Sequence, residues 1–147
     1  MNISKDHKII LFGDSISRGI ITTESKLQTI EENVVSLISK ELGIEIENIS
    51  SYGQTITRLQ NKGTIDEFIK KTKSENTTNQ IAVIAIGGND SDFDWTEVAK
   101  APLSAHSSKT PLDKFETILS DYVHKLKECN CQVVLVTIPP IQNCLTR

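Results

Sequence analysis

Long hydrophobic runs, strong net charge and a cysteine framework are all missing from this 147-residue chain. No stretch approaches the ~20 apolar residues that a membrane-spanning helix needs, and the start of the chain lacks the apolar core of an export signal. The formal net charge is -3, without a long basic block, which argues against nucleic acid as a partner. We therefore expect a cytoplasmic protein that binds neither membranes nor nucleic acid.

Cysteine is also scarce, with only Cys129, Cys131 and Cys144. An odd number cannot pair completely, and Cys129-Asn130-Cys131 has C-x-C spacing rather than the C-x-x-C spacing of zinc and redox motifs. No histidine stands nearby at the spacing of a zinc ligand. We interpret the cysteines as reduced and either structural or incidental, and expect neither a metal nor a cofactor.

What the chain does contain is an alternation of short apolar runs and longer polar, periodic segments, which is typical of βαβ units and a parallel sheet. Its length suits one domain, residues 1–147, with a sizeable core. Strands are expected at 9–12, 44–49, 81–86 and 132–138, and helices at 27–42, at 54–73 with an interruption near Gly63, and from Thr110 as N-cap onward. Residues 91–110 show little periodicity and are expected to form a long loop.

Three of the four predicted strands end in residues that could carry chemistry. These endings are Gly13-Asp14-Ser15, Ser51-Tyr52-Gly53 and Gly87-Gly88-Asn89-Asp90. Because the carboxyl ends of parallel strands open on one edge of a sheet, the three endings are expected to meet there. Ser15 is a candidate nucleophile. Its N–H, the N–H of Gly53 and the Asn89 amide could form an oxyanion hole.

Each of these residues also has an ordinary interpretation. Asp14 and Ser15 could cap the following helix, Gly53 could be a turn glycine, and Asn89 could belong to a glycine-rich turn. Taken singly the ordinary interpretations are favoured, but the joint placement of the three endings favours a site. In that site Gly13, Asp14, Gly88 and Asp90 would form the supporting turns.

The order and spacing of these motifs resemble the SGNH (GDSL) hydrolase superfamily over about residues 7–140. The resemblance implies a flavodoxin-like three-layer α/β/α sandwich with a parallel sheet in the order 2-1-3-4-5, of which about four strands are present. It also implies a serine esterase or acylhydrolase acting on a small acyl ester or acylated sugar. Ser15 would be the nucleophile, with Gly53 and Asn89 in the oxyanion hole.

The catalytic base is the part of the resemblance that this chain does not match. The family takes it from a late Asp-x-x-His motif after a fifth strand, and the chain ends before such a strand. We therefore expect a C-terminally truncated hydrolase whose activity is doubtful. A non-catalytic acyl- or carbohydrate-binding remnant is the alternative. A nucleotide binder is disfavoured because the glycine-rich phosphate motifs are absent.

The three histidines are poor candidates for that base. Asp121-Tyr122-Val123-His124 matches Asp-x-x-His in letters, but it lies in a predicted helix whose end approaches the amino edge of the sheet, opposite Ser15. His7, at the start of the first strand, lies at the same far edge. His106, in the long loop, is better placed, although a solvated loop histidine is the simpler interpretation.

A missing fifth strand would leave the fourth strand uncovered. Residues 133–136, Val-Val-Leu-Val, would then form a strongly apolar sheet edge without a protecting charge. Such edges pair readily with other chains. We therefore expect possible self-association through the fourth strand.

Overall fold

The structure is a computed structural model, which describes residues 3, 7–24, 26–75 and 78–137. Its elements in chain order are β1 (Lys8–Gly13), α1 (Ser15–Arg18), β2 (Ile20–Thr23), β3 (Lys26–Thr29), α2 (Val34–Leu42), β4 (Ile46–Asn48), α3 (Ile56–Asn61), α4 (Thr64–Glu75), β5 (Gln80–Ala85), α5 (Gly88–Ser91), α6 (Trp95–Lys100), α7 (Leu112–Glu128) and β6 (Gln132–Leu135). Within these ranges no helix combines the length and the apolar character needed to cross a membrane.

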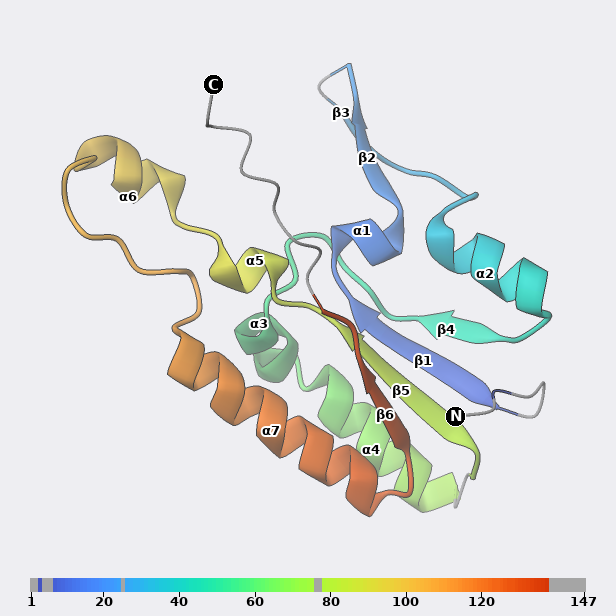
Figure 1. The fold of residues 1–147 in the computed structure, drawn as a ribbon. Coiled ribbons are helices and arrows are strands. Elements are labelled where there is room, and N and C mark those ends of the chain that lie inside the picture. Colours follow the sequence, from blue (N-terminus) through green and yellow to red (C-terminus); the bar gives the residue numbers. More distant parts are fainter. Residues whose placement is uncertain (1–2, 4–6, 25, 76–77, 138–147) are drawn as a thin grey trace.

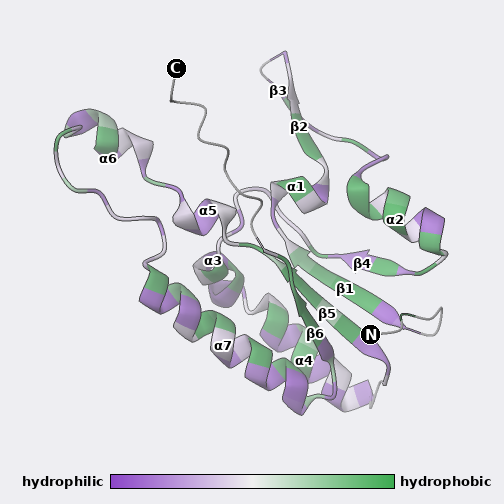
Figure 2. Ribbon diagram, viewed as in Figure 1, coloured by the Kyte–Doolittle hydropathy of each residue, from purple (hydrophilic) through white to green (hydrophobic). Residues whose placement is uncertain are grey.

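Four parallel strands form the main sheet in the order β4-β1-β5-β6, which confirms the predicted parallel sheet and its strand order 2-1-3-4. The longest pairing joins β1 to β5, from Lys8↔Gln80 to Gly13↔Ala85. These two strands carry the most apolar runs of the chain and lie in the middle of the sheet. Hydrophobic residues accordingly concentrate in β1 and β5 (Figure 2). A strand with neighbours on both sides and a packed face tolerates such a run.

Helices α3, α4 and α7 cover one face of the sheet, and α2 lies on the other side beside β4 (Figure 1). The larger core cluster fills the first interface, where Ile10 and Phe12 of β1 meet Ile65 of α4 and Tyr122 of α7. A smaller cluster around Ile9, Ile44 and Ile81 lies on the opposite face. Cys129 and Cys131 are free thiols buried in the larger cluster. Helices therefore flank a central parallel sheet, as predicted.

The prediction of a single helix over 27–42 is wrong in its first half. Ile20–Thr23 and Lys26–Thr29 pair as the antiparallel strands β2 and β3, and only Val34–Leu42 is helical. The helix starts where Asn33 caps it, because Asn33 Oδ1 accepts hydrogen bonds from the N–H groups of Val35 and Ser36. The Ser36 hydroxyl accepts from Asn33 N–H in return, which completes a capping box. The predicted end is correct, since Gly43 closes the helix in the left-handed conformation.

Three further details differ from the prediction. The N-cap of α7 is Pro111, not Thr110, and it makes no side-chain cap. Thr110 is buried instead, and its N–H donates to the carbonyl oxygen of Asp90, so tertiary packing has displaced the cap. The predicted long loop at 91–110 contains the short helix α6, which Asp94 caps through bonds from Thr96 and Glu97. Strand β6 ends at Leu135, and Ile138 lies outside the described residues.

Candidate active site

Ser15 is the first residue of α1, directly after β1. The preceding residue, Asp14, caps this short helix, since its Oδ1 accepts the Ile16 N–H at 2.9 Å. Asp14 therefore takes the capping role that the sequence left open between the two residues. The Ser15 side chain is partly exposed at the carboxyl end of the strand.

Gly13 lets the end of β1 pack directly against the loop that follows β4. A Cβ on Gly13 would lie 2.6 Å from Ser17 Oγ and 2.6 Å from Ser50 Oγ, too close for any side chain. The Gly13 carbonyl also accepts the Ser51 N–H at 3.2 Å. The first site loop (residues 13–15) is thereby fixed to the second (residues 50–55).

The second site loop turns at Gly53, whose φ of +61° is the left-handed conformation that glycine adopts without strain. The loop then enters α3, which Thr55 caps by accepting the Arg58 N–H at 3.1 Å. The side chain of Arg58 returns to the turn, where its Nη1 donates to the Tyr52 carbonyl at 2.9 Å and approaches the Gly53 carbonyl at 3.4 Å.

The third site loop (residues 87–90) holds the second through two side chains. Asn89 Nδ2 donates to the Gln54 carbonyl at 3.1 Å. The Asp90 carboxylate accepts the Ile56 N–H, at 2.9 Å to Oδ1 and 3.2 Å to Oδ2. Burial raises the pKa of Asp90, and the bond from Ile56 opposes that rise only in part. The third loop also reaches the first, since a Cβ on Gly88 would lie 3.8 Å from Asp14 Oδ2.

The three strand endings therefore meet at one edge of the sheet. The first loop contributes Ser15, the second Gly53, and the third Asn89, whose amide has two N–H donors of which Gln54 takes one. A largely apolar cavity of about 170 Å³ opens at this edge next to the first and third loops, lined by Asp14, Ile16, Ser17, Ala85, Ile86, Gly88, Val136 and Thr137. Among the described residues, no group of three His, Cys, Asp or Glu side chains is arranged to hold a metal ion.

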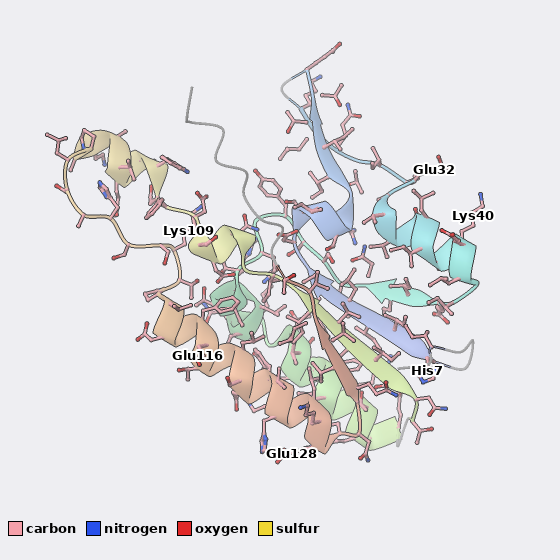
Figure 3. All side chains as sticks on the ribbon, viewed as in Figure 1. His7, Glu32, Lys40, Lys109, Glu116 and Glu128 are labelled. Atoms are coloured by element: carbon pink, nitrogen blue, oxygen red, sulfur yellow. The ribbon has the colours of Figure 1, made fainter. Side chains whose placement is uncertain are left out.

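None of the three histidines is held at this meeting point. His124 is exposed on α7, and its Nε2 lies 3.3 Å from Oε1 of Glu128, the last residue of that helix (Figure 3). His7 stands at the start of β1, at the amino edge (Figure 3). His106 Nε2 lies 2.8 Å from the Ala101 carbonyl, which ties the ring to its own loop.

Residues 92–110 form an arm that folds back on itself. Asp92 pairs with Lys109 at 2.6 Å and accepts the Trp95 Nε1–H at 2.9 Å. The N–H of Lys109 also donates to the Asp92 carbonyl. The helix of the arm, α6, stands away from α1 (Figure 1). The acids and aromatics of this arm thus serve its internal packing.

Sequence reasoning missed Gln54, Ile56 and Arg58, which connect the loops. Gln54 and Ile56 contact residues up to 35 positions away in the sequence. Arg58 donates to a backbone carbonyl, a group that every residue possesses. No local pattern signals such contacts.

With this fold and this arrangement of loops, the chain belongs to the GDSL-like lipase/acylhydrolase family, whose model matches residues 9–147. No curated protein matches the chain.

Solved structures share the fold. An acetyl xylan esterase is 24% identical with a TM-score of 0.59, over 87% of this chain and 56% of that one. A lipase/acylhydrolase from Enterococcus faecalis is 20% identical with a TM-score of 0.60, over 92% and 59%. The psychrotrophic esterase EstA from Pseudoalteromonas sp. is 22% identical with a TM-score of 0.55, over 92% and 62%. The chain thus spans about three fifths of the length of these structures.

Proposed function

We propose that the protein is a serine esterase or acylhydrolase whose nucleophile is Ser15. The observation that carries the proposal is the meeting of the three site loops, which puts Ser15, Gly53 and Asn89 at one edge of the sheet. Membership of the GDSL-like family supports the reaction class.

In the proposed reaction, Ser15 Oγ attacks the carbonyl carbon of an ester, and its proton passes to solvent or to an added base such as imidazole, because none of the three histidines lies at the site. The negative charge that develops on the carbonyl oxygen is stabilised by the N–H groups of Ser15 and Gly53 and by the Asn89 amide. Collapse of the intermediate breaks the ester bond and releases the alcohol. Water then attacks the acyl group on Ser15 and releases the acid.

The cavity at this edge of the sheet, which Asp14, Ile16 and Ser17 help to line, favours a small substrate. Its volume of about 170 Å³ is below the ~300–1,000 Å³ typical of drug-sized ligand pockets. Short acyl esters and acetylated sugars are therefore the first substrates to test. Such a substrate also agrees with the neighbour named an acetyl xylan esterase, although that likeness concerns the fold.

The test is hydrolysis of p-nitrophenyl acetate and butyrate by the wild-type protein and by Ser15→Ala. A serine activated by a base should give hydrolysis that Ser15→Ala abolishes. Added imidazole serves as a second arm: if Ser15 lacks a base, imidazole should raise the wild-type rate above that of Ser15→Ala measured at the same imidazole concentration. Equal rates for both proteins in both arms would refute the proposal.

Covalent labelling provides a measurement that does not depend on turnover. EstA has a structure inhibited by monoethylphosphonate. If a base activates Ser15, a fluorophosphonate probe should add one phosphonyl group to the peptide that contains Ser15, seen by mass spectrometry; without a base, labelling should be weak or absent.

The second candidate is a binding module that holds an acyl or sugar ligand through the same donors without turnover. The positions of the three histidines favour it, because an unactivated serine is a weak nucleophile. Thermal stabilisation by an ester or acetylated sugar, without hydrolysis or labelling, would support this module and exclude the esterase.

We also propose that copies of the protein associate through β6. This strand pairs only with β5 among the described residues, and Leu135 in it and Val136 directly after it are each 49% exposed. An apolar strand edge of this kind is a template for pairing with a second copy.

A further inference from the structure

Arg58 is hydrogen-bonded to the peptide group between Tyr52 and Gly53, whose N–H is one of the proposed oxyanion donors. Its Nη1 donates to the Tyr52 carbonyl at 2.9 Å. The Tyr52 carbonyl and the Gly53 N–H are the two ends of the same planar peptide unit, and they point in opposite directions. A bond that fixes the carbonyl oxygen therefore also fixes the direction of the N–H.

The left-handed turn makes this restraint necessary. Gly53, at φ +61°, has no side chain to limit rotation of the peptide units on either side of it. The next peptide unit, between Gly53 and Gln54, is approached by the same guanidinium, whose Nη1 lies 3.4 Å from the Gly53 carbonyl. The unit after that is restrained by Asn89, whose amide donates to the Gln54 carbonyl at 3.1 Å. Among the described residues, the Tyr52–Gly53 unit has only Arg58 as a side-chain partner.

The position of Arg58 is itself well defined. It lies in the first turn of α3, where its N–H is bound by Thr55 Oγ1 at 3.1 Å. The start of the same helix is anchored at Ile56 by the buried Asp90 carboxylate. The guanidinium therefore reaches the turn from a fixed backbone.

We propose that Arg58 is a positioning residue that orients the Gly53 N–H toward the oxyanion. The guanidinium holds the Tyr52 carbonyl away from the substrate and polarises the peptide unit, which strengthens its N–H as a donor. Because Arg58 is exposed, its own charge is screened from the reacting atoms, and its effect passes through the peptide unit. The catalytic part of this inference rests on the proposed esterase function.

The matched variants are Arg58→Met, Arg58→Lys and Lys62→Met. Methionine keeps the apolar stem and removes the donors, whereas lysine keeps one charged donor that can reach a single carbonyl. Lys62→Met is the control, because it removes the same charge from an exposed residue at the C-terminal end of α3 that does not contact the Gly53 turn. Circular dichroism and thermal unfolding of each variant establish that it is folded.

The first readout is NMR, which requires no activity. Loss of the bond should shift the carbonyl carbon resonance of Tyr52 and the amide nitrogen resonance of Gly53 in Arg58→Met but not in Lys62→Met. Unchanged resonances in Arg58→Met would overturn the inference, whatever the activity. Shifted resonances in a protein that hydrolyses no ester would leave the contact established and refute the proposed function instead.

The second readout is turnover of p-nitrophenyl acetate. Outright removal of an oxyanion donor costs about 10²–10³ in kcat, so a donor that is present but misdirected should cost about 10-fold. We expect Arg58→Met to lower kcat about 10-fold with KM changed less than about twofold, because the contact matters in the transition state. Arg58→Lys should recover part of the loss. A wild-type kcat in Arg58→Met would overturn the catalytic role.

Discussion

Replacing Asp90 by alanine should destabilise the fold measurably. Within the part of the chain that the structure describes, the Asp90 carboxylate is the only acceptor for the buried N–H of Ile56. Asp90 is 2% exposed and accepts the N–H of Ile56, which is 0% exposed. A buried donor left without an acceptor costs about 1–3 kcal/mol, and bonds to a charged group lie toward the upper end. We therefore expect Asp90→Ala to lose about 2–3 kcal/mol of unfolding free energy. At about 2–4 °C per kcal/mol for a chain of this size, Tm should fall by about 5–10 °C.

The contribution of Asp90 to folding stability should change with pH in a definite direction. Burial raises the pKa of Asp90 above its ordinary value, so the folded state binds the proton more tightly than the unfolded state does. The stability that results is fully present below the ordinary pKa and is lost as the pH rises through the raised pKa. Asp90→Asn keeps one oxygen for Ile56 and cannot titrate. The stability of the wild type relative to Asp90→Asn should therefore increase as the pH falls from 7 toward 3.

Urea unfolding followed by circular dichroism, at several pH values, measures both effects. Asp92→Asn is the matched control, because hydrogen bonding to the exposed Lys109 lowers the pKa of Asp92, and its small contribution should fade at low pH. The two variants should thus show opposite trends. The reasoning would be refuted by a loss below about 0.5 kcal/mol in Asp90→Ala, well under the cost of an unpaired buried donor, or by a parallel trend for both aspartates.

Three further predictions concern other parts of the chain. Gly53→Ala should lose about 1 kcal/mol, measured by urea unfolding, because alanine resists a positive φ; Gly53→Asn should lose less, and equal losses would contradict this explanation. Burial raises the pKa of Cys131 to about 11, so iodoacetamide at pH 8 should modify the Cys131 peptide only in urea; rapid labelling of the native protein would show that the thiol is accessible. Leu135→Lys should abolish concentration-dependent association in light scattering, whereas an unchanged mass would exclude β6 as the contact.

The four strands of the main sheet could be predicted because their signal is local. The buried runs of β1 and β5 are continuous, and each is followed by glycine and polar residues, so both the strand and its chemical ending are visible in the letters. Their shared edge follows from parallel pairing alone, which is why the sequence by itself is enough to group Ser15, Gly53 and Asn89.

The first half of the predicted helix at 27–42 failed because two signals compete there. Leu27 and Ile30 continue the helical spacing of the residues after them, yet both belong to a hairpin segment that pairs with the β-branched run of β2. The signal for the start of the helix is Asn33, whose capping box with Ser36 fixes the first helical residue as Val34. A cap is thus a better guide to the start of a helix than apolar spacing is.

The links between the loops are not visible in the sequence, and they determine how variants of the site should be interpreted. Asn89 is both a proposed oxyanion donor and a fixed support, since the same amide group binds the Gln54 carbonyl. Asn89→Ala would therefore lose a donor and loosen the second loop at once, and its loss of activity would overstate the donor. Arg58 is not itself a proposed oxyanion donor, so its variants leave all three donors in place and change the orientation and polarisation of the Gly53 N–H. Comparing the two, each against its own loss of stability, separates the donor itself from the orientation that makes it useful.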